Sequence, residues 1–228
     1  MLDKASIGGV YMNEAENRND PQDLRAQRKI LMRGMPIAAP VALLVWLALR
    51  YGLSPLPDMQ AWPDRLWFAI GCCCVAVLLC LLLGIEAVSH ERLVTTAINP
   101  LAGAESTRMK VNLRYLQNTL EQLLLFIPGL LGLAHYCDNG ASMRAVVATT
   151  VVWILARFVF WIGYHQGPLF RAPGLVGAVQ SLLVLLYVCA RFADDVAGIV
   201  GAVVVIGLFA FGEIYLVWIN RKSRVAQE

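Results

Sequence analysis

The sequence contains little charge. Only 15% of its 228 residues are Asp, Glu, Lys or Arg, whereas 58% are hydrophobic. A chain with so few charges cannot cover a water-soluble globule with polar surface, so lipid is the expected solvent. The net charge of +3 is small, and the basic residues lie mostly at chain ends and in loops rather than in a stripe with interleaved aromatic residues. The sequence therefore lacks the basic surface that is typical of a nucleic-acid-binding protein.

Familiar catalytic and metal-binding motifs are also missing. There is no His-Glu-x-x-His, no Gly-x-Ser-Gly nucleophile and no phosphate-binding glycine loop. The sequence therefore contains no motif of an intramembrane protease or of an enzyme that hydrolyses nucleotides. Histidine occurs only three times, with no pair expected at matched depth in a membrane, which weighs against haem. Cys72, Cys73, Cys74 and Cys80 lie inside an apolar run and are expected to pack as small hydrophobes. We expect neither a disulfide framework nor a metal site.

Long apolar runs dominate what is present. About 20 apolar residues are needed to cross a bilayer, and every crossing segment here must be helical because lipid leaves exposed backbone amides unsatisfied. The sequence therefore predicts an all-α integral membrane protein with six spans. The third run begins with polar residues and the fifth run is short, so either helix could be half-submerged or tilted. The runs cover about 34–52, 65–88, 112–136, 144–164, 173–190 and 197–219.

The distribution of Lys and Arg predicts the orientation of these spans. Thirteen of the 19 basic residues lie in residues 1–33, in the 89–111 and 165–172 loops, or in the C-terminal tail, which all fall on one side. By the positive-inside rule this side is cytoplasmic. We therefore expect a multi-pass protein of the cell or inner membrane with both termini in the cytoplasm. No convincing internal repeat supports an inverted-repeat transporter.

Ionisable residues inside the predicted spans point to a functional site, because such residues are costly in lipid. All of them fall in the cytoplasmic half of their spans. In the third span, Arg114, Asn118 and Glu121 are separated by four and three residues, so they share one helical face. The ionisable residues concerned are Glu86, Arg114, Glu121, Arg157 and Glu213.

The fourth span offers a matching polar face. Arg157 is followed by Tyr164 seven residues later, and Arg171 follows after seven more. Together the two faces would form an arginine-rich cleft that contains a carboxylate and opens toward the cytoplasm. Arg pairs with carboxylates and Glu with ammonium, so glutathione fits such a cleft. In the alternative interpretation, Glu121 and an arginine merely neutralise each other to hold helices together.

Two stretches at these residues resemble the MAPEG family, the membrane-associated proteins in eicosanoid and glutathione metabolism. Residues 114–122, Arg-Tyr-Leu-Gln-Asn-Thr-Leu-Glu-Gln, are similar to the family's R-x-x-x-N-x-x-E on its second helix. Residues 157–164, which begin with Arg157 and end with Tyr164, are similar to the third-helix R-x-x-x-x-x-x-Y, with Arg171 seven residues beyond. The sequence departs from family patterns at Gln117 and Phe160, which leaves the substrate open.

The resemblance implies a domain organisation. Residues 65–190 would form the family's four-helix bundle. Residues 1–33 would be a polar cytoplasmic arm, 34–64 an extra first transmembrane helix with its loop, and 191–228 an extra last helix with a basic tail. The fold class is then a MAPEG-like four-helix bundle with one extra transmembrane helix at each end.

The resemblance also implies a homotrimer that holds glutathione between subunits, while a lipophilic co-substrate enters from the membrane. Arg114, Asn118, Glu121 and Tyr164 would bind glutathione, with Arg157 supporting the site. Arg171 would stabilise the thiolate, because a nearby cation lowers a thiol pKa. The expected function is a glutathione-dependent transferase or peroxidase. The alternative is a non-catalytic lipid-binding or assembly protein of the same fold.

Overall fold

A computed structural model describes residues 21–166 and 174–225 of the chain, and all of its described elements are helical. The all-α class therefore agrees with the prediction. Along the chain the elements are α2 (Pro21–Gly52), α3 (Trp62–Ala76), the π-helical segment η1 (Val77–Leu82), α4 (Leu83–Val94), the short 3-10 turns η2 (Thr96–Ile98) and η3 (Pro100–Ala102), α5 (Thr107–His135), α6 (Gly140–Gln166) and α7 (Leu175–Val225).

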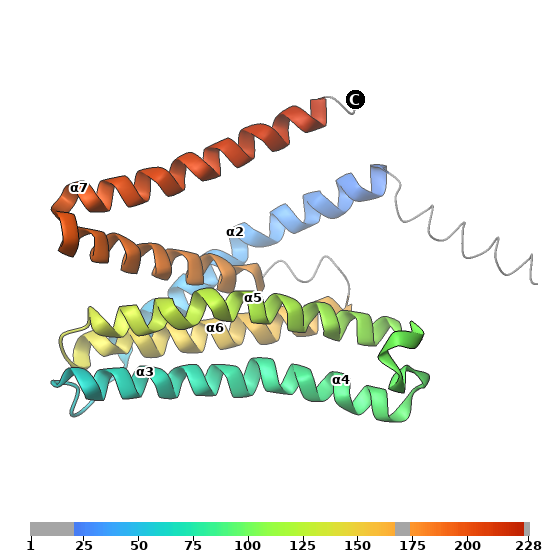
Figure 1. Ribbon diagram of the computed structural model, residues 1–228, viewed down its shortest axis with the longest axis horizontal. Helices are drawn as coiled ribbons and strands as arrows, with labels where there is room; N and C mark the ends of the chain where they lie inside the picture. The colour runs from blue at the N-terminus through green and yellow to red at the C-terminus, as the bar shows by residue number, and fades with distance from the viewer. Residues whose placement is uncertain (1–20, 167–173, 226–228) are drawn as a thin grey trace, which may run out of the picture.

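The bundle is built from three long antiparallel rods and the first part of α7. Figure 1 shows α3, η1 and α4 as one continuous rod beside α5 and α6, with the first part of α7 lying along α5. The core between these rods is made of large apolar side chains, and the rings of Phe126 and Trp153 stack at 4.5 Å between α5 and α6. α2 crosses the bundle obliquely, and the last part of α7 leaves it. One end of the bundle lies at the α4–α5 connection and the other at the α5–α6 turn.

Four of the described helices contain segments long and apolar enough to cross a membrane. These segments are Gly34–Gly52, Trp62–Val94, Gly140–Gln166 and Leu175–Arg221. α5 is not among them, because its first half carries several charged and amide side chains. The sixth predicted run and the described part of the fifth, apart from residue 174, fall within α7. The protein is thus a multi-pass membrane protein by its helices, but six separate spans are not confirmed.

The chain reverses its direction within α7. Ala197 (φ −134°, ψ 16°) and Gly198 (φ 65°, ψ −165°) are not helical, and beyond them the helix turns back toward the end of the bundle from which α7 started (Figure 1). Glycine suits this position because a positive φ with an extended ψ is disfavoured for residues that carry a Cβ. The reversal comes shortly after Asp194 and Asp195, a residue type that is common in turns.

A polar contact fixes α7 just before its reversal. The hydroxyl of Tyr136, in the α5–α6 turn, donates a hydrogen bond of 2.7 Å to Oδ2 of Asp195. The guanidinium of Arg191 lies 5.2 Å from the centre of the Tyr136 ring. Hydrogen bonding to the Asp195 carboxylate raises the pKa of Tyr136 above its usual value. The α5–α6 turn and α7 are therefore tied together at this end.

The π-helical segment in the first rod has a packing partner. The hydroxyl of Tyr115, a fully buried residue of α5, donates a 2.9 Å hydrogen bond to the backbone carbonyl of Cys80. A π-helical turn interrupts the regular i to i−4 ladder, and a side chain inserted there can satisfy a carbonyl. Tyr115 therefore joins α5 to the π-helical segment of the neighbouring rod.

Several hydrogen bonds anchor α2 and the loop after it on α6, among them one from Nη1 of Arg50 to the carbonyl of Ala141 at 2.7 Å. The indole Nε1 of Trp46 donates to Oγ1 of Thr149 at 3.1 Å. The backbone amide of Leu56, in the loop after α2, donates to the carbonyl of Gly140 at 3.1 Å. A Cβ at position 140 would overlap the carbonyl oxygen of Leu56, so only glycine permits this close approach. The extra first helix is thus attached to the start of α6.

Candidate functional site

A polar pocket lies near the α4–α5 end of the bundle. It has a volume of about 290 Å³ and is lined by residues of three helices. α5 contributes most of the polar groups, α6 contributes aromatic rings, and the start of α7 closes one side. The lining residues are Arg114, Gln117, Asn118 and Glu121 of α5, Phe160 and Tyr164 of α6, and Leu175 of α7.

The α5 side of the polar pocket carries a short chain of hydrogen bonds. Nη1 of Arg114 donates to Oε1 of Gln117 at 3.0 Å, and Nε2 of Gln117 donates to Oε1 of Glu121 at 3.2 Å. The spacings of three and four residues place these side chains one above another on the helix. A neutral amide therefore separates a cation from a carboxylate, and both charged side chains are exposed to a ligand.

Arg157 forms the support behind this pocket. Its side chain is completely buried, and its Nη1 donates to Oδ1 of Asn118 at 2.7 Å. Its Nη2 donates to the carbonyl of Gly174 at 2.7 Å, and the guanidinium carbon lies 4.8 Å from the centre of the Phe160 ring. One side chain of α6 thereby ties α5 to the chain entering α7. Its charge is met by neutral dipoles and an aromatic face.

The carboxylate of Glu121 is not used to neutralise an arginine in the part of the chain that the structure describes. Two acidic side chains of the described residues lie near a basic one: Glu86 is 3.5 Å from Nε2 of His90, and Glu91 is 4.0 Å from Nε of Arg108. Glu121 accepts its hydrogen bond from Gln117 instead. The interpretation of Glu121 as a helix-neutralising partner of Arg114 or Arg157 therefore has no support from these contacts.

Of the residues selected from the sequence, Arg114, Asn118, Glu121 and Tyr164 line the polar pocket together. Arg157 lies behind the pocket, where it holds Asn118. Arg171 lies outside the described residues. Their roles in binding and catalysis stay predictions.

Sequence reasoning did not assign Gln117 or Leu175 to the site. The position of Gln117, three residues after Arg114 and four before Glu121, was a signal that could have identified it. Leu175 carried no such signal.

Two other acidic residues of the apolar runs lie elsewhere. The carboxylate of Glu86 is 3.5 Å from Nε2 of His90, one helical turn further along α4. Glu213 is exposed on the part of α7 that leaves the bundle. Among the described residues, no group of three or more His, Cys, Asp or Glu side chains could hold a metal ion. These acidic residues therefore do not extend the polar pocket.

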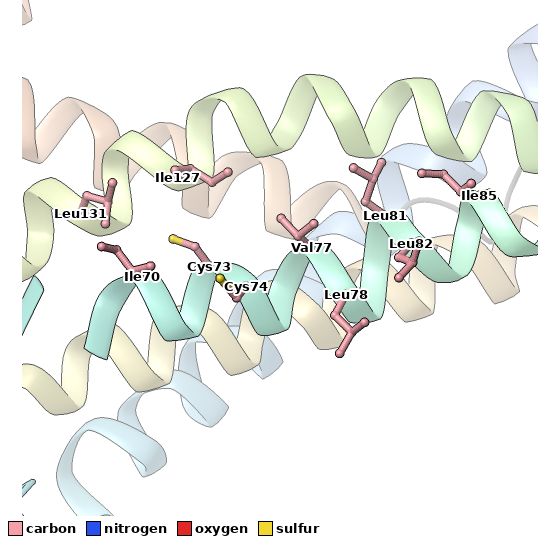
Figure 2. A pocket seen from close by; sticks show the side chains of 10 residues that line it. All are labelled: Ile70, Cys73, Cys74, Val77, Leu78, Leu81, Leu82, Ile85, Ile127 and Leu131. Carbon is pink, nitrogen blue, oxygen red and sulfur yellow. The ribbon is translucent and has the colours of Figure 1, made fainter. Parts of the chain in front are cut away.

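An apolar groove lies between the first rod and α5. Figure 2 shows side chains of α3, η1 and α4 lining it together with Ile127 and Leu131 of α5. Its volume is about 480 Å³, and all lining side chains end in carbon or sulfur. Cys73 and Cys74 are part of the lining, and both are free thiols. The groove contrasts with the polar pocket and offers only apolar contacts.

The fold and the pocket define a class: a multi-pass helical membrane protein in which a polar pocket lies between helices near one end of an apolar bundle. The chain belongs to the MAPEG family, whose sequence model matches residues 68–191. That region contains the rod from residue 68 of α3 to the end of α4, then α5, α6 and the first part of α7. It leaves α2 and the last part of α7 outside the match.

One relative has been found among curated proteins. The chain is 36% identical over 75 residues to an uncharacterized protein of Synechocystis sp., an overlap of 32% of this chain and 52% of that protein. The chain thus spans about half the length of this relative. No solved structure matches the chain.

Proposed function

We propose that this protein is a glutathione-dependent membrane transferase or peroxidase that acts on a lipophilic electrophile. The observation that supports it is the polar pocket, in which Arg114, Asn118, Glu121 and Tyr164 come together from two helices of a MAPEG-family bundle. We place the protein in the cell or inner membrane. By the positive-inside rule, this end of the bundle and both chain termini lie on the cytoplasmic side.

The lining residues match the groups of glutathione. The guanidinium of Arg114 pairs with a carboxylate of the tripeptide, and the carboxylate of Glu121 accepts hydrogen bonds from its ammonium group. Gln117 adds an amide that can turn toward either partner. Arg157 acts through Asn118, whose oxygen it holds at 2.7 Å, and is a positioning residue in this proposal.

The chemistry requires a thiolate. Arg171, which follows Tyr164 by seven residues, provides the cation that lowers the pKa of the glutathione thiol. In the transferase reaction the thiolate sulfur attacks an electrophilic carbon, a carbon–sulfur bond forms, and the leaving group departs with its electron pair. In the peroxidase reaction two glutathione molecules are oxidised to the disulfide, while a hydroperoxide is reduced to an alcohol and water.

Membership of the MAPEG family supports a trimeric site. The pocket of one chain provides about 290 Å³. A neighbouring subunit of a homotrimer would supply the remaining wall. The lipophilic co-substrate would then reach the thiolate from the membrane.

Binding and turnover of glutathione test this proposal. Purified protein in detergent should bind glutathione, and it should turn over a chlorinated aromatic compound or a lipid hydroperoxide. Arg171→Ala should abolish turnover while binding remains. Glu121→Gln should weaken binding about 10- to 100-fold, because a hydrogen bond to a charged group contributes about 1.5–3 kcal/mol. Glu105→Gln, which changes a carboxylate outside the pocket in the same way, should bind as the wild type does.

The alternative is a non-catalytic lipid-binding or assembly protein. The apolar groove between the first rod and α5 is the observation that favours it. In that case a lipid raises the melting temperature of the protein in detergent and glutathione does not. Absence of both glutathione binding and turnover would remove the enzymatic proposal.

A further inference from the structure

The chain that enters α7 packs on α6 with no room for a side chain at Gly174. This glycine is buried, and a Cβ added to it would overlap the Cβ of Phe160 and lie 2.7 Å from the Cα of the same residue. Cβ atoms do not come that close to other heavy atoms, so glycine is what allows the two segments to meet. The contact lies at the edge of the polar pocket, because Phe160 and Leu175, the residue after Gly174, both line it.

Arg157 connects this contact to α5. Its Nη2 donates to the carbonyl of Gly174 and its Nη1 donates to Oδ1 of Asn118, each at 2.7 Å. The guanidinium is planar and rigid, so a shift of one acceptor also moves the group that bonds the other. The side chain of Arg157 is completely buried, where water does not readily replace a broken bond. The position of Gly174 is therefore transmitted to Asn118.

The bond from Arg157 decides which atom of Asn118 faces a ligand. A guanidinium carries only donors, so the side-chain amide of Asn118 must turn its oxygen toward Arg157. Its Nδ2, which carries two N–H donors, is then the polar atom left for a molecule in the polar pocket that Asn118 lines. In this orientation Asn118 donates hydrogen bonds to a ligand rather than accepting them.

From this arrangement we infer that Gly174 is a further positioning residue of the glutathione site. Its close packing on α6 fixes Arg157, which turns the N–H groups of Asn118 toward a carboxylate or carbonyl oxygen of glutathione. Gly174 itself touches no ligand in this scheme. The inference rests on the proposed function, which supplies glutathione as the ligand.

A double-mutant cycle on glutathione binding tests the inference. Binding is measured by isothermal titration calorimetry with the full-length protein in detergent. Gly174→Ala and Asn118→Ala should each weaken binding about 10-fold, the ratio expected when one hydrogen bond to the ligand is lost. The double variant should also bind about 10-fold more weakly, rather than about 100-fold, because the second change removes a bond that the first has already lost.

Two single variants separate orientation from stability. Asn118→Asp keeps an acceptor for Arg157 but replaces the Nδ2 donor by a carboxylate oxygen, so glutathione should bind more weakly than to Asn118→Ala. Gly132→Ala is the control for general loosening of α7, because a Cβ at this position of α5 would overlap Cγ1 of Val188 on α7. Position 132 is 14 residues along α5 from Asn118, about 21 Å. This control should lower the melting temperature and bind glutathione as the wild type does.

A backbone change tests the same bond without altering the packing. Incorporation of the α-hydroxy analogue of leucine at position 175 converts the amide between Gly174 and Leu175 into an ester and leaves both side chains as they are. An ester carbonyl is a weaker acceptor than an amide carbonyl, so the bond from Arg157 is weakened. Glutathione should bind about 2- to 10-fold more weakly, and this measurement decides the question if Gly174→Ala does not fold.

Three results would overturn the inference while leaving the proposed function in place. In the first, the effects of Gly174→Ala and Asn118→Ala multiply, so Gly174 does not act through Asn118. In the second, Asn118→Asp binds glutathione as the wild type does, so Asn118 is not a donor to the ligand. In the third, the ester at position 175 leaves binding unchanged. Absence of glutathione binding by the wild-type protein would remove the proposed function and this inference together.

Discussion

Replacement of Gly140 by alanine should strongly destabilise the fold, because α2 is joined to α6 at this glycine. The new Cβ would overlap the carbonyl oxygen of Leu56 and lie 2.8 Å from its carbonyl carbon, closer than side chains are found to approach. The loop must move away, which breaks the 3.1 Å hydrogen bond from Leu56 to Gly140. A lost hydrogen bond costs about 1 kcal/mol and overpacking about 1–3 kcal/mol, so we expect a loss of about 2–4 kcal/mol.

Thermal unfolding in detergent measures this effect. For a chain of this size the loss corresponds to a decrease in Tm of roughly 4–16 °C. Gly71→Ala is the matched control, because nothing lies within 4 Å of a Cβ at that helical position. Its Tm should be unchanged or slightly higher, since alanine favours a helix by up to about 1 kcal/mol. If Gly140→Ala and Gly71→Ala unfold at the same temperature, the close contact between the α2 loop and α6 is not what holds α2 in place.

Three further variants test single hydrogen bonds. Tyr115→Phe should lower stability by about 1–3 kcal/mol in thermal unfolding, because it leaves a π-helical carbonyl without its donor; an unchanged Tm would contradict this role. Trp46→Phe should cost about 1 kcal/mol and make α2 more accessible to limited proteolysis, since its bond to Thr149 is lost; unchanged cleavage would count against it. In an alkaline absorbance titration, Tyr136 should ionise above the usual pKa of about 10. Its contribution to stability should be present below that pH and disappear as pH rises through the raised pKa, and a titration unchanged by Asp195→Asn would refute the contact.

Much of the helical organisation could be predicted from hydropathy alone. The predicted runs at 65–88, 112–136 and 144–164 each fall within one rod, because long apolar stretches have no alternative to a helix in lipid. The last two runs could not be separated correctly from composition. Asp194 and Asp195 are of a residue type that favours turns, but they remain helical, and the break falls at Ala197 and Gly198. The reason is conformational: the chain reverses at the residue that tolerates a positive φ.

Helical spacing could predict which residues of one helix face the polar pocket, but not the rest of its wall. Intervals of four and three residues put Arg114, Asn118 and Glu121 on one face, but they do not say which neighbouring helix that face meets. The bond from Arg157 to Asn118 depends on how α5 and α6 are packed, and the contribution of Leu175 depends on where α7 enters the bundle. The pocket between α2 and the bundle, which Trp46, Thr149 and Gln180 help to line, had no sequence signature, because these residues belong to three different helices.

The reversal at Gly198 has a consequence for topology. Because the last part of α7 runs back, the beginning of α2 and the end of α7 point toward the same end of the bundle, where the polar pocket also lies (Figure 1). With the cytoplasmic termini that we propose, a reporter domain joined to either of these helices would share an aqueous compartment with any molecule that enters the pocket.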